Sequence, residues 1–322
     1  MGHSRNRKHL CVIISGPTGA GKSAIACTIA EKLSGEIINA DSRQFFSEIS
    51  IGTAKPSPEI IDRIPHHLIG FLSIKDDFTV FDFRERVEAI IPGIWQRGNV
   101  PLITGGSGFY IRALVKGIFD LPESSKNRLK EIRLSLESKT TDELYRQLAL
   151  IDPCITVKLH ANDRVRIRRA LEIWHATGRP MSCWQAEARP ARFLKECELF
   201  HFVVCPARSK LYQRIDARTE EMFAAGWVNE VRGLLNQGLG EYLRARAPIG
   251  YPEIADYLEL GGRYQQLVED VKRKTRNYAK RQISWFRKEE KCIWLSPQDE
   301  TPEMIAHIIL EYLREAYFAT AG

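Results

Sequence analysis

Residues 16–23 read GPTGAGKS and match G-x-x-x-x-G-K-[ST], a pattern in which backbone N–H groups, a lysine and a helix N-terminus bind phosphate. The β-branched run CVIIS precedes the segment, and the helical pattern AIACTIAEKL follows it. This context favours a phosphate-binding loop over a glycine-rich turn without a ligand. The loop alone does not distinguish a nucleoside triphosphate from another diphosphate. Ser23 is a candidate Mg²⁺ ligand, and the candidate phosphate contacts are Gly16, Pro17, Thr18, Gly19, Ala20, Gly21, Lys22 and Ser23.

Two further polar residues follow apolar runs. Asp41 comes directly after EIINA, and Ser107 follows VPLIT and two glycines, where a phosphate-loop hydrolase or kinase usually has a metal-binding carboxylate. Ligands of open parallel sheets bind at the carboxyl ends of the strands, so we expect Asp41 beside the phosphate loop. Asp41 is a candidate general base or metal ligand, and a turn or N-cap aspartate is the competing interpretation. The adjacent His66 and His67 lack the spacing of a metal-binding pair.

A basic segment lies towards the end of the sequence. Residues 272–288 carry eight Lys or Arg and no acid, interleaved with Tyr278, Trp285 and Phe286. On a helix, one face would dock to the core through Ala279, Ile283 and Phe286, and another would meet RNA phosphates or only solvent. The basic face comprises Arg273, Arg276, Lys280 and Arg287. A second cluster, RVRIRR at 164–169, contains Arg168, which is also spaced to pair with Glu172 one helical turn later.

The elements that must position these residues alternate between short strands and long helices. Five β-branched runs, at 11–15, 36–40, 100–104, 199–205 and 292–295, are separated by helical patterns. This spacing predicts an α/β protein with a mostly parallel sheet. Between Thr104 and Leu199 only helical periodicity is present, and a stripe of Ile167, Ala170, Leu171 and Trp174 leads to a predicted helix end at Gly178. We therefore predict a core of 1–119 and 196–322 with a helical insertion at 120–195.

The composition is that of a folded, moderately basic protein, which suggests a polyanionic partner but also fits an ordinary basic enzyme. The 322 residues are 44% apolar, the formal net charge is +7 and the isoelectric point is near 9.0. Seven scattered cysteines without a C-x-x-C pair indicate a reduced, cytoplasmic protein and neither a disulfide framework nor a zinc site. No apolar run is long enough for a secretory signal or a membrane span.

Several long segments, in this order, resemble the bacterial tRNA dimethylallyltransferases over nearly the whole chain: GPTGAGKS, DSRQFFSEISIGTAKP, IPHHLIG, RGNVPLITGGSGFYIRALVKG, NDRVRIRRALEIWHATGRP, IGYPE and TRNYAKRQISWF. The resemblance implies a P-loop NTPase-like core that transfers a dimethylallyl group, with Mg²⁺, to N6 of the adenosine just 3′ of the tRNA anticodon. The phosphate loop and Arg218 would hold the diphosphate leaving group. Asp41 would be the general base, and Ser107, a threonine in most of the family, would donate to the bridging oxygen. A monomer that binds one tRNA anticodon stem-loop is expected.

The same resemblance assigns the remaining substrate contacts. Asp41, Ser42, Arg43 and Gln44 would contact the target base, and Ser107 and Arg128 would lie close to the RNA. The other tRNA-contacting candidates are Val165, Arg166, Ile167, Arg168 and Arg169, then Arg246, Ala247, Pro248, Ile249, Gly250 and Tyr251, and finally Arg276, Lys280 and Arg281 on the basic segment. A P-loop small-molecule kinase and a non-catalytic RNA-binding protein are the alternatives.

Overall fold

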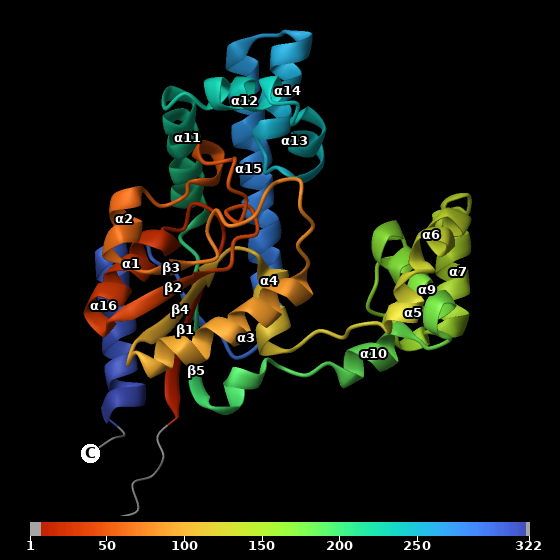
Figure 1. Cartoon of the computed structure of the whole chain (residues 1–322), viewed down its shortest axis with the longest axis horizontal. Helices are drawn as coiled ribbons and strands as arrows, with labels where there is room; N and C mark the ends of the chain where they lie inside the picture. Colours follow the sequence, from red (N-terminus) through yellow and green to blue (C-terminus); the bar gives the residue numbers. More distant parts are fainter. Residues whose placement is uncertain (1–7, 320–322) are drawn as a thin grey trace, which may run out of the picture. The chain divides into compact units, whose positions relative to one another are not determined.

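The computed structural model describes residues 8–319 (Figure 1). The chain divides into two compact units, one of residues up to Ile111 together with those from Arg192 onward, and one of Arg112–Ala191. The helical unit thus starts and ends before the predicted limits of 120 and 195. It starts earlier because its two connecting segments pair, with Ala191 N donating to Leu114 O at 2.8 Å. It ends earlier because Arg192 N donates to Glu88 of the first unit at 2.9 Å.

The described part of the first unit contains a six-stranded sheet in the order β3-β2-β4-β1-β5-β6, with all neighbouring strands parallel. This confirms the predicted α/β class. The loop expected at IPHHLIG contains a two-residue strand, too short for any periodicity to show in the sequence. The strands are β1 (His9–Ser15), β2 (Gly35–Asn39), β3 (His66–His67), β4 (Val100–Gly105), β5 (Cys197–Val204) and β6 (Ile293–Leu295).

Helices cover both faces of this sheet. Val12 and Ile14 of β1 pack with residues of α1 (Lys22–Leu33) and α16 (Pro302–Leu313), while the alternate residues Cys11 and Ile13 are also fully buried. Continuous burial of this kind is typical of a parallel strand between two helical layers. The other helical elements of the first unit are η1 (Ile51–Thr53), α2 (Pro58–Arg63), α3 (Val80–Gln96), η2 (Arg192–Lys195) and η3 (Arg314–Phe318). The boundary between the two units falls within α4 (Gly108–Val115).

A second apolar cluster of the first unit lies among its later helices. Trp227 and Tyr251 are buried there with Phe46, Ile49 and other residues of the segment that follows β2. The segment after β2 is therefore packed against helices almost two hundred residues away in sequence. These helices are labelled in Figure 1 as α11 (Arg208–Ala224), α12 (Trp227–Asn236), α13 (Gly240–Arg246), α14 (Tyr251–Leu260) and α15 (Tyr264–Phe286).

The helical unit has its own small core. Ile167 and Leu171 pack with Leu144 and Leu148, and α9 ends at Gly178, whose φ of 70° is the left-handed conformation that glycine adopts readily. The stripe and the helix end predicted from the sequence are confirmed. Within residues 8–319 we find no helix long and apolar enough to cross a membrane. The helices of this unit are α5 (Glu123–Lys126), α6 (Leu129–Glu137), α7 (Thr141–Ile151), α8 (Pro153–Thr156), α9 (Arg164–Thr177) and α10 (Met181–Glu187).

Candidate active site

The loop from Gly16 to Gly21 connects β1 to α1 in the strand, loop and helix order of a phosphate-binding loop. A Cβ on Gly16 would lie 2.1 Å from the Val204 carbonyl oxygen, so only glycine lets the loop leave the sheet so close to β5. Gly21, with a φ of 85°, is the N-cap of α1, which starts at Lys22 without a side-chain cap. The first N–H groups of this helix are therefore available to an anion.

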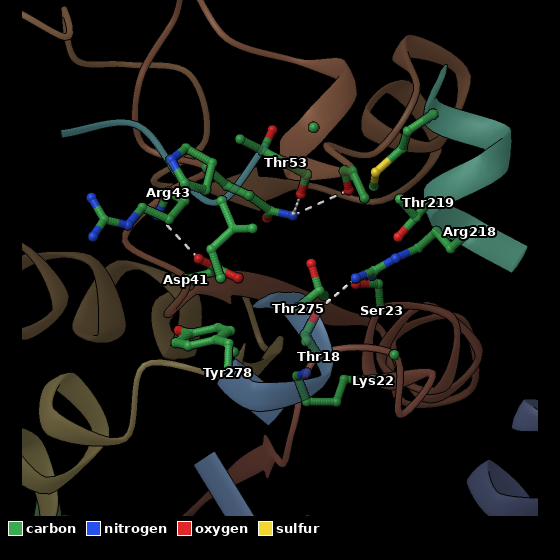
Figure 2. A pocket seen from close by; sticks show the side chains of 18 of the residues that line it. Thr18, Lys22, Ser23, Asp41, Arg43, Thr53, Arg218, Thr219, Thr275 and Tyr278 are labelled. Carbon is green, nitrogen blue, oxygen red and sulfur yellow. Dashed lines mark hydrogen bonds between the residues drawn. The ribbon is translucent and has the colours of Figure 1, made fainter. Parts of the chain in front are cut away.

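A cavity of about 590 Å³ opens over this loop. Figure 2 shows Lys22, Thr18 and Arg218 on one side of it and Asp41 and Arg43 on the other. The wall combines the phosphate loop, the turn after β2, η1, and the facing sides of α11, α12 and α15. Of the predicted site residues, it includes Thr18, Gly19, Gly21, Lys22, Ser23, Asp41, Ser42, Arg43, Gln44, Arg218, Ala247, Pro248, Ile249 and Arg281.

Two cations meet at the phosphate loop. Lys22 Nζ donates to Pro17 O at 2.8 Å. Arg218 Nη2 donates to Thr18 Oγ1 at 2.6 Å (Figure 2). Burial lowers the pKa of Lys22 to about 8, with Arg218 acting in the same direction and Asp41 opposing it. Burial also lowers the pKa of Arg218, although an arginine stays charged. Two neighbouring half-buried cations favour an anion in the space that they share.

Asp41 is held in a tight turn at the end of β2. Its N–H donates to Asn39 Oδ1 at 2.9 Å. Its Oδ1 accepts from Arg43 N at 3.0 Å (Figure 2). The competing interpretation, a turn aspartate, therefore describes the local geometry correctly, yet the side chain also lines the cavity. Across from it, burial raises the pKa of Tyr278 to about 12, and the Asp41 charge adds to the shift. Asp41 is thus rigid, faces the cavity and has a neutral phenol beside it.

Ser107 meets the same turn from the end of β4. Its Oγ accepts from Ser42 N at 3.1 Å and donates to Ser42 Oγ at 3.4 Å. The approach is close because Gly105 allows it: a Cβ there would lie 2.2 Å from the Ala40 carbonyl. Within the part of the chain that the structure describes, the cavity wall does not include Ser107, Gly16, Pro17 or Ala20. Donation from Ser107 to a bridging oxygen therefore stays a prediction.

Gln282 of α15 was missed by the sequence analysis. Its Oε1 accepts from Thr18 N at 2.9 Å and its Nε2 donates to Gly106 O at 2.9 Å, so one buried amide joins the phosphate loop to the turn after β4. Because these contacts span 264 and 176 residues, no local pattern could have revealed them. Other cavity residues that were not singled out are Asn39, Gly52, Thr53, Ala54, Thr104, Arg214, Thr219, Met222, Trp227, Val271 and Thr275.

Some predicted tRNA contacts are part of the packing of the first unit. Tyr251 is fully buried, and a Cβ on Gly250 would lie 2.0 Å from the ring of Trp227. Arg246 binds the Asp77 carboxylate at 2.7 Å and the Lys75 and Asp76 carbonyls. These side chains are committed to the fold, so contact with RNA at 246–251 falls to Ala247, Pro248 and Ile249, which line the cavity.

The basic face of α15 is partly neutralised within the first unit. Lys272 binds Glu220 and Glu269, both at 2.7 Å, and Arg276 binds Asp216 at 2.6 Å. The core-facing side is as predicted, since Ala279 and Phe286 are buried. Lys280 and Arg281 are exposed, and Arg281 lies over the Tyr278 ring at 5.6 Å. Among the cations of α15, Arg281 is the one that lines the cavity.

The basic cluster of the helical unit surrounds one buried acid. Glu172 binds Arg133 at 3.0 Å, Arg168 at 3.5 Å and Arg169 at 3.3 Å, which confirms the predicted pair with Arg168. Ile167 is fully buried, so its side chain is unavailable to RNA. Val165 and Arg166 are exposed at the start of α9, and Arg128 is the N-cap of α6.

Comparisons with known proteins agree over most of the chain. Family models described as IPP transferase and isopentenyl transferase match residues 44–289 and 10–73. The tRNA dimethylallyltransferase 1 of Citrifermentans bemidjiense is 41% identical, with 95% of this chain and 98% of the relative covered. That of Geobacter sulfurreducens is 41% identical over 92% and 94%. The crystal structure of the Bacillus halodurans tRNA isopentenylpyrophosphate transferase has a TM-score of 0.68 at 32% identity, covering 96% of this chain and 98% of that one. A eukaryotic dimethylallyltransferase acting on tRNA has a TM-score of 0.71 at 26% identity, covering 97% and 77%.

Proposed function

This chain belongs to the tRNA dimethylallyltransferase family, and from that premise we propose that it transfers a dimethylallyl group from dimethylallyl diphosphate to an adenosine of tRNA. The acceptor is N6 of the adenosine just 3′ of the anticodon, and diphosphate is released. The observation that carries this proposal is the cavity itself, which places Lys22 and Arg218 on one wall and Asp41 on another. The wall with the two cations suits an anionic leaving group, and the wall with Asp41 suits a nucleophile that must lose a proton.

The wall with Lys22 and Arg218, which we call the phosphate end of the cavity, contributes more electrostatic stabilisation to the transition state than the wall with Asp41. Cleavage of the allylic C–O bond leaves its electron pair on the diphosphate, whose negative charge grows in the transition state. Lys22, Arg218 and the N–H groups at the start of α1 already surround this position, so they stabilise the leaving group without reorganising. Gln282 fixes the Thr18 backbone beside them.

At the other wall, Asp41 acts on the amine. As the N6 lone pair forms the new C–N bond, one N6 proton passes to the Asp41 carboxylate, which leaves a neutral secondary amine on the base. An exocyclic adenine amine is a weak nucleophile, so holding it in line with the allylic carbon contributes as much as the proton transfer. The turn bonds of Asp41 to Asn39 and Arg43 provide that rigidity.

Magnesium is proposed as the cofactor, with the Ser23 hydroxyl as its protein ligand. Ser23 lines the cavity next to Lys22. Among the described residues there is no group of three or more His, Cys, Asp or Glu that could hold a metal. This donor set fits Mg²⁺, which keeps several waters and binds through substrate phosphates rather than a protein cage. When bound, the ion neutralises charge on the diphosphate.

A small-molecule kinase is the alternative that the phosphate loop alone permits. At the end of β4, however, the chain has Ser107 bonded to the turn of Asp41, where a kinase would have a metal-binding carboxylate. The family assignment also disfavours it. We further propose that the protein works as a cytoplasmic monomer on one tRNA.

The test incubates the protein with Mg²⁺ and undermodified tRNA, and with either labelled dimethylallyl diphosphate or γ-labelled ATP. Label should reach the RNA only from the prenyl donor. Asp41→Asn should abolish transfer while tRNA binding persists, and Asp62→Asn, an exposed aspartate of α2, is the matched control. Transfer from ATP, or from neither donor, would show that the proposed activity is wrong.

A further inference from the structure

The turn at residues 50–54 forms part of the cavity wall and contacts a residue predicted to touch the target base. Gly52, Thr53 and Ala54 line the cavity together with Gln44. The side-chain Nε2 of Gln44 donates to Thr53 O at 3.0 Å and to Ala54 O at 3.1 Å. The position of this turn therefore determines the position of the Gln44 amide.

These two contacts also fix which way the amide points. A backbone carbonyl oxygen only accepts hydrogen bonds, so the NH₂ group of Gln44 must face Thr53 and Ala54. The reverse orientation would place Gln44 Oε1 against the carbonyl oxygens of Thr53 and Ala54, and none of the three can donate a hydrogen. Gln44 thus offers Oε1, an acceptor, on the side away from the turn, and Gln44 N donates to Asp41 O at 3.1 Å within the same backbone turn.

Three side chains of α12 and α14 hold the turn, and we call Trp227, Glu230 and Tyr251 the brace. Trp227 and Tyr251 are buried, and Glu230 is half-buried. Glu230 Oε2 accepts from Ile51 N at 3.0 Å and from Ser50 N at 3.3 Å. The Tyr251 hydroxyl accepts from Gly52 N at 3.1 Å and donates to Glu230 Oε1. Three consecutive backbone N–H groups are thus bound by two side chains about 180 to 200 residues away.

Packing leaves the turn little freedom. A Cβ on Gly52 would lie 2.1 Å from the Trp227 ring, so the backbone rests directly on the indole. The rings of Trp227 and Tyr251 meet edge to face, with centroids 5.4 Å apart. Burial and the Glu230 carboxylate raise the pKa of Tyr251 above its ordinary range, so its hydroxyl remains a donor to Glu230.

We propose that the brace is a positioning device for the base end of the cavity: it sets the 50–54 turn, the turn sets Gln44, and Gln44 Oε1 accepts one N6–H of the adenine. This inference rests on the proposed function. An adenine amine carries two hydrogens, and Asp41 needs one of them. Gln44 in the same turn takes the other, which holds the amine in plane, whereas guanine would present a carbonyl there and be repelled. In this way Glu230 and Tyr251, which do not line the cavity, act on the reaction through the turn, together with Trp227, whose ring forms part of the cavity wall.

The experiment uses the full chain with Glu230→Gln and Tyr251→Phe, which keep the shape of each side chain. The matched controls are Glu241→Gln, an exposed acid of α13, and Tyr242→Phe, a nearby tyrosine whose ring lies under Arg246. Two quantities are measured: hydrogen exchange of the peptide that contains residues 50–54, and kcat and KM for dimethylallyl diphosphate and tRNA.

Both brace variants should lose exchange protection at 50–54. A misplaced amine typically slows the chemical step by about 10-fold to 100-fold, so kcat should fall by that factor. KM for dimethylallyl diphosphate should stay within about twofold, because the phosphate end is built from other elements. A general loss of stability would instead lower exchange protection in peptides throughout the first unit and not only at 50–54. The control variants should behave like the unaltered protein.

Unchanged exchange protection in both variants would overturn the proposal, since the turn would then be held by something else. Lost protection with unchanged kcat would overturn the proposal as well, because the chemical step would then not depend on the position of the 50–54 turn. Exchange is measured without substrate, so a failure of the brace is distinguishable from a failure of the proposed activity, which the unaltered protein tests. If one variant does not fold, the other variant tests the same two predictions, on exchange protection and on kcat.

Discussion

The half-buried position of Lys22 predicts how binding of the prenyl donor depends on pH. The pKa of Lys22 is lowered to about 8 by burial, while that of an ordinary lysine lies above 10. Its charge faces the space where the diphosphate is proposed to bind. The protonated form should bind the anion, so donor affinity should fall as the pH rises through about 8.

The size of the effect follows from the titration. If the complex holds Lys22 protonated, the apparent Kd is multiplied by 1 + 10^(pH − pKa). Between about pH 7.5 and about pH 9.5 this factor rises roughly 25-fold, which corresponds to about 1.9 kcal/mol of binding free energy. The terminal phosphate of the donor loses its second proton near about pH 6, so it is already ionised throughout this window.

The assay is calorimetric titration of dimethylallyl diphosphate with Mg²⁺ and without tRNA, so that no transfer takes place. Lys22→Gln should bind more weakly at low pH and show a nearly flat profile. Lys32→Gln, an exposed lysine on the same helix, is the control and should keep the slope of the unaltered protein. A flat profile in the unaltered protein, or an equal slope in Lys22→Gln, would refute this role of the Lys22 charge.

Three further changes test the supports of the site. Gln282→Leu leaves Thr18 N and Gly106 O without their buried partner, so KM for dimethylallyl diphosphate should rise and the free energy of unfolding should fall by about 1 to 3 kcal/mol. Gln265→Leu, at an exposed glutamine, is the control. An unchanged KM would show that the Gln282 bridge does not shape the phosphate loop. Gly105→Ala should cost about 2 to 3 kcal/mol by denaturant unfolding, because its Cβ would overlap Ala40, whereas Gly233→Ala in an open part of α12 should stabilise the protein by up to about 1 kcal/mol. Ser107→Ala should slow turnover at least about tenfold and Ser107→Thr should preserve it; little loss in the alanine variant would exclude donation by this hydroxyl.

The sequence predicts the fold well where the pattern is local. The phosphate loop, the five longer strands and the end of α9 at Gly178 each depend on a few neighbouring residues, and each is where it was expected. The two-residue β3 and the limits of the helical unit were not predicted correctly. These features are decided by pairing between segments that are distant in the chain, which composition and periodicity do not report.

The pairing of basic residues with acids was also beyond what the sequence pattern could predict. Residues 272–288 contain eight cations, yet Lys272 and Arg276 are paired with Glu220 and Asp216 of α11, an acidic face that the basic segment does not reveal. In the helical unit, Glu172 takes up Arg168 and Arg169 in the same way. A count of basic residues therefore overstates the charge that remains for RNA. Of the exposed cations in this segment, Arg281 lines the cavity.

One helix links these observations. Along α15, Gln282 binds the phosphate loop and the turn after β4, Tyr278 lies opposite Asp41, and Arg281 reaches the cavity rim. The same helix buries Ala279 and Phe286, so its register is fixed by the core. A shift of this helix would displace the phosphate loop and the base end of the cavity together. The two halves of the proposed reaction are therefore held at a fixed separation by packing energy, and this separation is what an in-line attack on the allylic carbon requires.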